Sequence, residues 1–575
     1  MSMMTRAVLL ACGVVMAAGS AVAVPPTPAP SISTGPDVVA SGIGSSSGSS
    51  PFGDSTTGGV TTNGSVGSVV AYSVGTISCN IGTADAIWTS GTNAHPLIGT
   101  QIYRYRIVNG AGQFDQIGLN WLKHSFCAAD AANCSQLTNP AGALGGGSGC
   151  QWLGRFATDT YGAGLNGSQS SLGPRSEVNP WTGAYPYPYV LGAGATGDAI
   201  YKRTQVKTAD LIAGANYVVE VVYICTDEPA ANRYNNYSYR IGTSSGTTIS
   251  MTGSTEALRP AIVGWKEKYD NQVTLVNIDP SGLSDGRLIL GYRVTQTGPT
   301  TWHYEYNVFN MNNHDSVRSF SVPVSGGVSM SNVDFNDVDY HSGEPYSGTD
   351  WPLTTGGGAA TWATQTFAQN SNANAIRWST MYSFRFDANA APRTGTATLG
   401  MFRSGSSVTV ENVLVPTVPT PERFSLVSPQ NGATAPGLTP TLTWSESGNA
   451  ESYTVTVAND PGLTDPVAGG SVAALSFPVP NGSLVAGRTY YWNVTALNQG
   501  GSKAAFGGPW SFLTPPPACV GDLNNDGATN TGDLAVFLGA FGTAVTPGTS
   551  GDLDGDGNVN TADLALILGA FGCGA

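Results

Sequence analysis

The chain has 575 residues, a formal net charge of −14, 75 glycines and only 11% charged residues. Soluble domains usually carry about a quarter of charged residues, so this composition favours many short strands and turns over helices rich in Glu and Lys. The acidic charge argues against nucleic-acid binding, which needs a basic face. A chain of this length is expected to contain roughly three to five domains.

Residues 1–23 have the pattern of a secretory signal peptide. Arg6 gives the positive start, AVLLACGVVMAAG the apolar stretch, and small residues up to Ala23 the cleavage site. The apolar stretch is too short to span a bilayer, and we expect no transmembrane segment. Lipid attachment through Cys12 is less favoured, because only five residues separate it from Arg6. We therefore expect a secreted, extracellular or cell-surface protein after cleavage near Ala23.

Residues 24–66 are rich in Pro, Gly and Ser and are expected to form a flexible leader. The following region, to about residue 415, shows alternating apolar segments separated by Gly, Asn, Ser and Pro clusters. We expect antiparallel β-sandwiches, divided into a β-rich domain with disulfides at 67–250 and a second β-rich domain at 251–415. The clearest predicted strands are 101–108, 216–226, 286–297, 302–311 and 317–324, and a short helix is considered for 118–134.

Several phrases of this region, among them HPLIGTQIYRY, QIGLNWLKHSF and VDFNDVDYHSGEPYSGTDW, resemble an uncharacterised group of secreted bacterial proteins. The resemblance supports export and implies no activity.

A Pro/Thr linker (416–422) precedes a second β pattern at 423–514. Trp444 stands on an early predicted strand, and Leu484 precedes Tyr490 with the spacing of a tyrosine corner. The segment therefore resembles a fibronectin type III domain. A Pro-rich linker (515–518) follows it. In the fibronectin-like segment, the strand within LVAGRTYYWNVTALN is predicted to place four side chains on one face, namely Tyr490, Trp492, Val494 and Ala496.

The last part of the chain, residues 519–575, contains one segment twice. GDLNNDGATNTGDLAVFLGAFG begins at Gly521, and GDLDGDGNVNTADLALILGAFG begins 30 residues later at Gly551. Each copy has oxygen-bearing side chains at loop positions 1, 3, 5, 9 and 12, a backbone carbonyl at position 7 and a turn-forming Gly at position 6. This donor set suits Ca²⁺, and we expect two ions. The predicted ligands are Asp522, Asn524, Asp526, Ala528, Asn530 and Asp533 in the first loop, and Asp552, Asp554, Asp556, Asn558, Asn560 and Asp563 in the second.

A calcium loop followed by an apolar helix, present in two copies, resembles the type I-like dockerin module, a small α-helical calcium-binding domain. The resemblance implies a cohesin-like or cell-surface protein partner. In the family, loop positions 10 and 11 contact that partner, and a basic pair follows on the helix. Here Leu538-Gly539 and Leu568-Gly569 replace the basic pair, so the identity of the partner is not carried over. The corresponding partner-binding positions are Thr531, Gly532, Thr561 and Ala562.

Residues 504–575 contain seven Asp and no Lys, Arg or Glu. These carboxylates repel one another without cations, so calcium is expected to couple to folding. Cys519 and Cys573 bracket the repeat and are predicted to form a disulfide, which would restrict the unfolded chain by roughly 4 kcal/mol. The pairing of the other mature cysteines is open, with one left unpaired or paired between molecules; they are Cys79, Cys127, Cys134, Cys150 and Cys225.

Three other clusters in the β-rich region are weighed against plainer interpretations. One cluster could form a soft-metal site and contains His95, His124, Cys127 and Cys134. We favour the interpretation that its cysteines form disulfides and that His124 is a packed or surface residue. A hard-cation site is less favoured than a solvated strand edge at Asp334, Asp337, Asp339, His341 and Glu344. A carbohydrate-stacking surface is less favoured than a covered sheet edge at Arg175, Glu177, Trp181, Tyr185, Tyr187 and Tyr189.

The dockerin resemblance also leaves an enzymatic alternative. Dockerins often tether polysaccharide-degrading enzymes, so residues 67–415 could contain an unrecognised glycoside hydrolase. Its paired carboxylates would come from Glu177, Glu220 or Glu267, but the sequence gives no reason to pair any two of them. Serine-hydrolase, zinc-protease and nucleotide-binding motifs are lacking.

Overall fold

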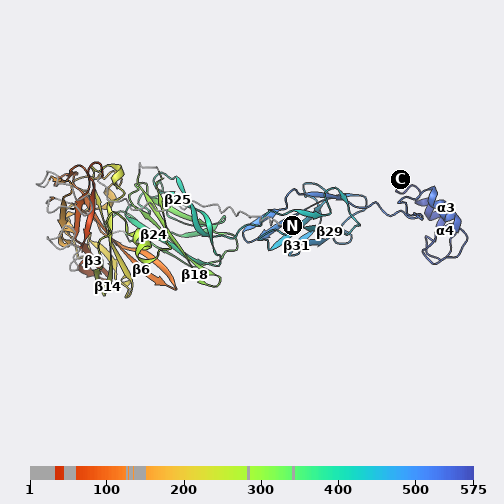
Figure 1. The fold of residues 1–575 in the computed structure, drawn as a ribbon, viewed down its shortest axis with the longest axis horizontal. Helices are drawn as coiled ribbons and strands as arrows, with labels where there is room; N and C mark the ends of the chain where they lie inside the picture. The colour runs from red at the N-terminus through yellow and green to blue at the C-terminus, as the bar shows by residue number, and fades with distance from the viewer. Residues whose placement is uncertain are drawn as a thin grey trace, which may run out of the picture. The chain divides into compact units, whose positions relative to one another are not determined.

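The computed structural model describes residues 33–44, 60–124, 127–128, 134, 151–280, 285–339 and 343–574. The chain divides into two compact units, Met1–Thr417 and Val418–Ala575. Strands dominate the fold, as the composition predicts, and the two longest α-helices of the described residues lie near the C-terminus (Figure 1). Among the described residues, no helix has the length and apolar character needed to cross a membrane.

A seven-stranded antiparallel sheet forms the centre of the first half of unit 1. Its long strands carry alternating apolar side chains, as predicted for 101–108 and 216–226. In order, the sheet contains β11 (Leu172–Gly173), β8 (Leu122–His124), β6 (Leu97–Val108), β13 (Asn216–Ile224), β14 (Tyr237–Ser245) and β15 (Thr248–Met251), with β7 (Ala111–Leu119) pairing β6. Residues 122–124 are thus a strand and not part of the short helix considered for 118–134; the rest of that segment lies partly outside the described residues.

Three smaller sheets pack with it. They are β1 (Val38–Ile43), β4 (Thr76–Asn80) and β10 (Thr158–Tyr161); β12 (Thr204–Lys207), β3 (Val69–Val74) and β2 (Val60–Val66); and β5 (Ala86–Ile87) with β9 (Trp152–Leu153). Two of these strands, β1 and β2, lie in the segment predicted to be a flexible leader. All six residues of β1 are buried, because β1 pairs with β4 and packs into the core. The Gly- and Ser-rich sequence around β1 hid this strand.

Two five-stranded sheets form a sandwich in the second half of unit 1. Tyr304, Tyr306 and Phe384 from one sheet and Phe320 and Trp362 from the other share one buried core. This arrangement confirms the predicted antiparallel β-sandwich class. The sheets run β16 (Thr274–Ile278), β18 (Leu288–Gly298), β19 (Thr301–Asn310), β24 (Thr380–Ala388) and β21 (Met330–Asn336), and β22 (Leu353–Gly356), β23 (Ala359–Ala363), β20 (Val317–Pro323), β25 (Pro392–Met401) and β26 (Ser407–Pro416).

The predicted domain boundary at 250/251 falls where the chain leaves β15 for the second sandwich. A single buried cluster crosses this point, since Val218 and Tyr237 from the first half pack with Phe309 and Met381 from the second. Trp265 belongs to the same cluster and is fully buried. The short helices of unit 1 are α1 (Ala163–Asn166), α2 (Ala261–Gly264), a π-helix at Trp265–Tyr269, and 3-10 turns at Gln169–Ser171, Arg175–Glu177, Thr208–Asp210 and Ala230–Asn232.

Residues 426–513 form a fibronectin-like sandwich. The backbone N–H of Val485 donates to the Tyr490 hydroxyl at 2.9 Å, which is the predicted tyrosine corner. Trp444 and the predicted face of β33 are buried in one core. The two sheets contain β27 (Leu426–Ser428), β29 (Thr441–Trp444) and β32 (Ser476–Pro478), and β28 (Ala433–Thr434), β35 (Trp510–Leu513), β33 (Thr489–Asn498), β30 (Ser452–Ala458) and β31 (Pro466–Val472), with β34 (Gly501–Ala504) pairing β33.

The C-terminal module is built from two loop–helix repeats, with helices α3 (Thr531–Ala540) and α4 (Thr561–Gly569) (Figure 1). Its small core contains Phe537 from α3, Ile567 from α4 and Val559 from the second loop. Both helices begin with a capping box, with Asn530 and Asn560 at the N-cap. The sequence repeat thus folds into two matching structural units.

Candidate metal centre

The first loop is organised around Asp533, the third residue of α3. Its carboxylate is buried and accepts backbone N–H groups from Leu523 (2.8 Å), Asn524 (3.0 Å) and Asn530 (3.0 Å). The carboxylate of Asp522 accepts the N–H of Gly527 at 2.9 Å. The two Asp side chains therefore hold the loop in a ring with carboxylate oxygens on its inner side.

The second loop repeats this arrangement. The buried carboxylate of Asp563 accepts backbone N–H groups from Leu553 (2.7 Å), Asp554 (3.0 Å) and Asn560 (2.9 Å). Asp552 accepts the N–H of Gly557 at 2.8 Å. Because the repeats share their sequence pattern, the same side chains close both rings.

Carboxylate oxygens converge in each ring. Oxygen atoms of Asp522, Asp526 and Asp533 lie within 4.8 Å of one another, as do those of Asp552, Asp554 and Asp563. The predicted ligand Asp556 is not part of the second converging set, and it accepts the N–H of Asn558 at 2.8 Å. The donor atoms are oxygens, which suits a hard cation such as calcium. The other predicted positions, which lie on the same loops, are Asn524, Ala528, Asn530 and Asn560.

The charges in the loops oppose one another. The pKa of Asp554 is raised: the N–H of Asp556 donates to it and acts to lower the value, but burial and repulsion from Asp556 and Asp563 outweigh this effect. Burial alone would raise the pKa of Asp533, but the backbone donors of Asn530, Asn524 and Leu523 together outweigh it and lower the pKa. In the first ring the backbone donors favour the ionised form of Asp533, whereas in the second ring neighbouring carboxylates disfavour the ionised form of Asp554. A bound cation relieves such repulsion.

Cys519 and Cys573 form a disulfide with a Cα–Cα distance of 5.5 Å, which confirms the predicted pair. It joins the start of the first loop to the segment that follows α4.

The predicted partner-binding positions lie at the first turns of the two helices. Thr531 and Thr561 are exposed. The N–H groups of Gly532 and Ala562 donate to the N-cap side chains at 2.6 and 2.7 Å. Both repeats also expose apolar side chains at equivalent positions, namely Val536 and Leu538 on α3 with Phe541 just after it, and Leu566 and Leu568 on α4 with Phe571 just after it.

The cysteines and the histidines of the soft-metal candidate do not form one site: the cysteines are disulfide-bonded, and the histidines contact each other. Cys134 is bonded to Cys79 in a buried disulfide, so neither offers a thiolate. Cys127 is disulfide-bonded as well, and Cys150 lies outside the described residues. The structure thus favours the disulfide interpretation of this cluster.

The two histidines of that candidate pair with each other. His95 Nε2 and His124 Nδ1 lie 2.9 Å apart, and both rings are buried. Burial lowers the pKa of His95 to about 4, and burial with nearby positive charge lowers the pKa of His124 to about 3. Tyr185, Tyr187 and Tyr189 surround the pair with ring centroids 4.5 to 5.9 Å away. The tyrosines of the carbohydrate candidate therefore enclose a neutral histidine pair.

Trp181, the remaining aromatic residue of the carbohydrate candidate, is also buried. Trp181, Tyr185 and Tyr189 are each at most 7% exposed, so their rings are packed and not presented for stacking. Arg175 is buried, and its guanidinium donates to the backbone of Asn120 at 2.6 Å. These contacts favour the covered-edge interpretation.

The acidic segment around residue 334 distributes its carboxylates among different partners. Asp334 pairs with Arg385 at 3.0 Å, and exposed Asp339 pairs with Lys207 at 2.5 Å. Glu344 accepts the backbone N–H of Arg175 at 2.6 Å. The side chains thus do not form one cation site. Asp337 accepts from Asn374, and His341 lies outside the described residues.

The three glutamates that could supply the paired carboxylates of a glycoside hydrolase occupy separate environments. Glu177 accepts the N–H groups of Val190 and Leu191 at 2.8 and 2.7 Å. Glu220 is fully buried and accepts from the Tyr103 hydroxyl at 2.9 Å; burial raises its pKa to about 7. Glu267 pairs with an arginine at 2.9 Å. Each carboxylate has a structural partner.

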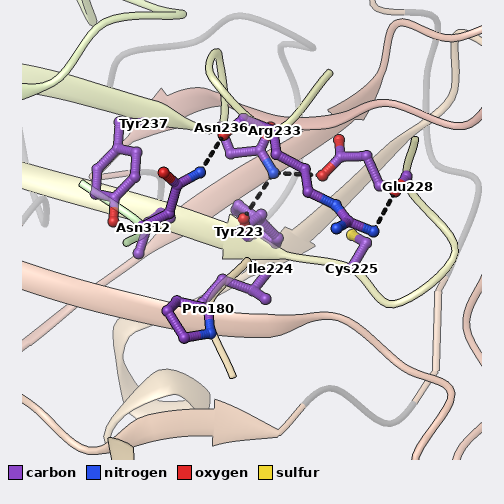
Figure 2. A pocket seen from close by; sticks show the side chains of 10 residues that line it. Pro180, Tyr223, Ile224, Cys225, Glu228, Arg233, Asn236, Tyr237 and Asn312 are labelled. Atoms are coloured by element: carbon purple, nitrogen blue, oxygen red, sulfur yellow. Dashed lines mark hydrogen bonds between the residues drawn. The ribbon is translucent and has the colours of Figure 1, made fainter. Parts of the chain in front are cut away.

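A small pocket around Cys225 was not anticipated from the sequence (Figure 2). Cys225 is a free, buried cysteine, and burial raises the pKa of its thiol well above the usual value. The side-chain amide of Asn236 donates to the Tyr223 carbonyl at 3.1 Å and to the Glu228 carboxyl, and Arg233 donates to the Glu228 carbonyl at 2.5 Å. The thiol is therefore protonated and enclosed. Most of its lining residues lie between Val222 and Tyr237, and Pro180 and Asn312 complete it from distant segments.

Comparison with known proteins gives one family match. Residues 520–570 match the model of the dockerin type I domain. No curated protein matches the chain.

Several solved structures share a low level of similarity with the chain. A beta-1,2-glucanase from Parabacteroides distasonis is 12% identical with a TM-score of 0.13, over 43% of this chain and 37% of its own. The BSP domain of a biofilm-associated protein is 8% identical with a TM-score of 0.16, over 78% of each chain. The FN1–FN3 domains of chicken CNTN1 are 10% identical with a TM-score of 0.15, over 79% of this chain and 97% of their own.

The family match and the loop geometry agree with each other. Paired loops lined by Asp, each followed by a capped helix, occupy the matched residues. Dockerin type I domains bind calcium and a cohesin partner and belong to extracellular or cell-surface proteins. Residues 520–570 of this chain are a dockerin type I domain.

Proposed function

We propose that this chain is an exported modular protein that docks through residues 519–575 to a cohesin-bearing or cell-surface protein and carries its β-rich region as cargo. The observation that carries the proposal is the pair of matching loops, in which three carboxylates converge within 4.8 Å at the start of each helix. The fibronectin-like sandwich at 426–513 acts as a spacer between cargo and docking module.

Each loop holds one calcium ion in this proposal, through the six residues predicted for it. The donor set fits the ion, because residues 504–575 contain seven Asp and no Lys or Arg that would compete for the carboxylates. Bound calcium supplies the positive charge that offsets repulsion within each ring. The chain's own part is to hold the carboxylates in place, through Asp533 and Asp563 and their backbone donors.

Calcium binding is tested by its effect on stability. An ion that binds only the folded module stabilises it by about 2.7 kcal/mol per site at 100 times its Kd. Hydrogen exchange of residues 519–575 in the full chain is therefore expected to slow when Ca²⁺ replaces a chelator. Unchanged exchange would contradict the proposal.

Docking uses the exposed first turns of α3 and α4. Because the repeats are nearly alike, either can present its own turn to the partner. We expect the Thr531→Ala and Thr561→Ala single variants to retain binding to immobilised cohesin modules, and the double variant to lose most of it. Equal binding by the double variant would exclude these positions from the docking surface.

The dockerin also allows the cargo to be a polysaccharide-binding or polysaccharide-degrading region at 67–415, which stays a prediction. A glycan array and a hydrolysis screen with the full chain distinguish the cases. Binding without turnover indicates a binding module, and turnover indicates an enzyme.

A further inference from the structure

Each calcium loop is completed by a segment from elsewhere in the module. In the second loop, the N–H of Val559 donates to the Thr543 carbonyl at 2.9 Å, and the N–H of Gly542 donates to the Val559 carbonyl at 2.8 Å. Residues 542–543 follow α3 after its C-cap residue Phe541. The segment that follows the helix of the first repeat therefore forms backbone hydrogen bonds to the second loop.

The first loop is completed in the same way by the segment after α4. The N–H of Thr529, equivalent to Val559, donates to the Cys573 carbonyl at 2.9 Å, and the N–H of Gly572 donates to the Thr529 carbonyl at 2.8 Å. The two repeats thus support each other reciprocally.

The two supporting segments differ in how they are held. Residues 542–543 belong to the connection between α3 and the second loop, so the backbone holds this segment on both sides. Residues 572–573 follow α4, and the Cys519–Cys573 disulfide ties them to the start of the first loop. Cys519 also lies beside the loop, since its carbonyl accepts the N–H of Asp522 at 3.2 Å. The supporting segment of the first loop is therefore tied to that loop by the disulfide, whereas the supporting segment of the second loop is tied to it by the continuous backbone.

The loops also differ in charge. The first contains three aspartates among its predicted ligands, Asp522, Asp526 and Asp533, whereas the second contains four. Calcium affinity in such loops rises with ligand charge and with the rigidity of the site. The first loop has fewer charges, so its affinity depends more on rigid support.

We propose that the Cys519–Cys573 disulfide sets the calcium affinity of the first loop and leaves the second unaffected, which makes one of the two sites redox-dependent. This inference rests on the proposed function, in which both loops hold calcium. Reduction by a dithiol would break the S–S bond, add two electrons and two protons to give two thiols, and oxidise the dithiol to a disulfide. Loss of support behind metal ligands weakens binding by about 10- to 100-fold, and we expect roughly a tenfold effect at the first loop.

The test separates the loops in the full chain. Asp556→Ala disables the second loop and Asp526→Ala disables the first, and these residues occupy equivalent exposed positions. Cys519→Ser with Cys573→Ser is then added to each background, and calcium binding is measured by calorimetry. The expected result is a tenfold weaker Kd in the Asp556→Ala background and an unchanged Kd in the Asp526→Ala background.

Two outcomes overturn the inference, namely an equal loss in both backgrounds and no loss in either. A failure of both single-loop variants to bind calcium with the disulfide intact would instead overturn the proposed function. Hydrogen exchange in chelator provides a second measurement that does not depend on binding. Removing the disulfide is expected to speed exchange at 528–530 and not at 558–560; equal acceleration of both loops counts against the inference.

Discussion

The guanidinium of Arg385 donates to the carboxylate of Asp115, which lies 270 residues earlier in the chain. Both side chains are buried, with exposed fractions of 2% and 0%. Asp115 also pairs with Arg104 at 2.9 Å, and Arg385 pairs with Glu305 at 2.7 Å. Burial alone would raise the pKa of Asp115, but the two arginines outweigh it and hold the value low. This chain of charges joins β7 to β24 across the predicted domain boundary.

Replacing Asp115 is expected to destabilise unit 1 strongly. Asp115→Asn removes the buried carboxylate that Arg104 and Arg385 share, while Arg385 keeps its pair with Glu305. Breaking a buried pair typically costs about 3–5 kcal/mol. Hydrogen exchange in denaturant, followed on peptides from β7 and β24, measures this loss.

The matched control is Asp339→Asn. Asp339 pairs with Lys207, but these side chains are 61% and 59% exposed. Exposed pairs contribute about 0–1 kcal/mol, so little change is expected. If both variants lose the same stability, the buried charge chain does not hold the two halves together.

Glu220 predicts a pH dependence for the same unit. Burial raises its pKa from 4.5 to about 7 in the folded state. Between these values the unfolded chain releases the proton and the folded chain keeps it, so stability falls as pH rises from about 4.5 to 7. Above that range both states are ionised and this contribution is constant.

Glu220→Gln is expected to remove this part of the pH dependence, because the amide stays neutral. Unfolding free energies of the wild-type and variant chains, measured between pH 4.5 and 8, give the difference. Glu267→Gln serves as the control, since Glu267 is only partly buried and pairs with Arg259. A difference between wild type and Glu220→Gln that does not vary with pH would show that Glu220 has no raised pKa.

The strands of the β region were predictable because alternation is a local signal. The segment 302–311, for example, became β19 at Thr301–Asn310 with Tyr304 and Tyr306 inward. The calcium loops were predictable for a similar reason, since all their oxygen donors lie within twelve consecutive positions.

Long-range relationships gave no such signal. His95 and His124 were noted as neighbours of cysteines, but their partner proved to be each other, enclosed by tyrosines from a third segment. The strand β1 is buried because it pairs with β4 and packs into the core, whereas its own sequence has the composition of a Gly- and Ser-rich leader. Such features depend on tertiary pairing, which composition and periodicity do not record.

In the docking module, Asp563 and Asp556 are expected to behave differently. Asp563 accepts three backbone N–H groups and caps α4, whereas Asp556 is exposed in the loop. Both Asp563→Ala and Asp556→Ala should lose calcium from the second loop. Asp563→Ala should also weaken α4 by about 1 kcal/mol without calcium, because a cap is lost.

Hydrogen exchange of α4 in chelator separates these roles. Faster exchange in Asp563→Ala than in Asp556→Ala is the expected result. Equal exchange would mean that Asp563 acts only as a ligand.

The most direct test of the docking module is a calorimetric titration of the chelator-treated full chain with Ca²⁺. The account predicts two ions per chain, with one lost in Asp526→Ala, one lost in Asp556→Ala and both lost in the double variant. A chain that takes up no calcium, or whose binding survives the double variant, would contradict it.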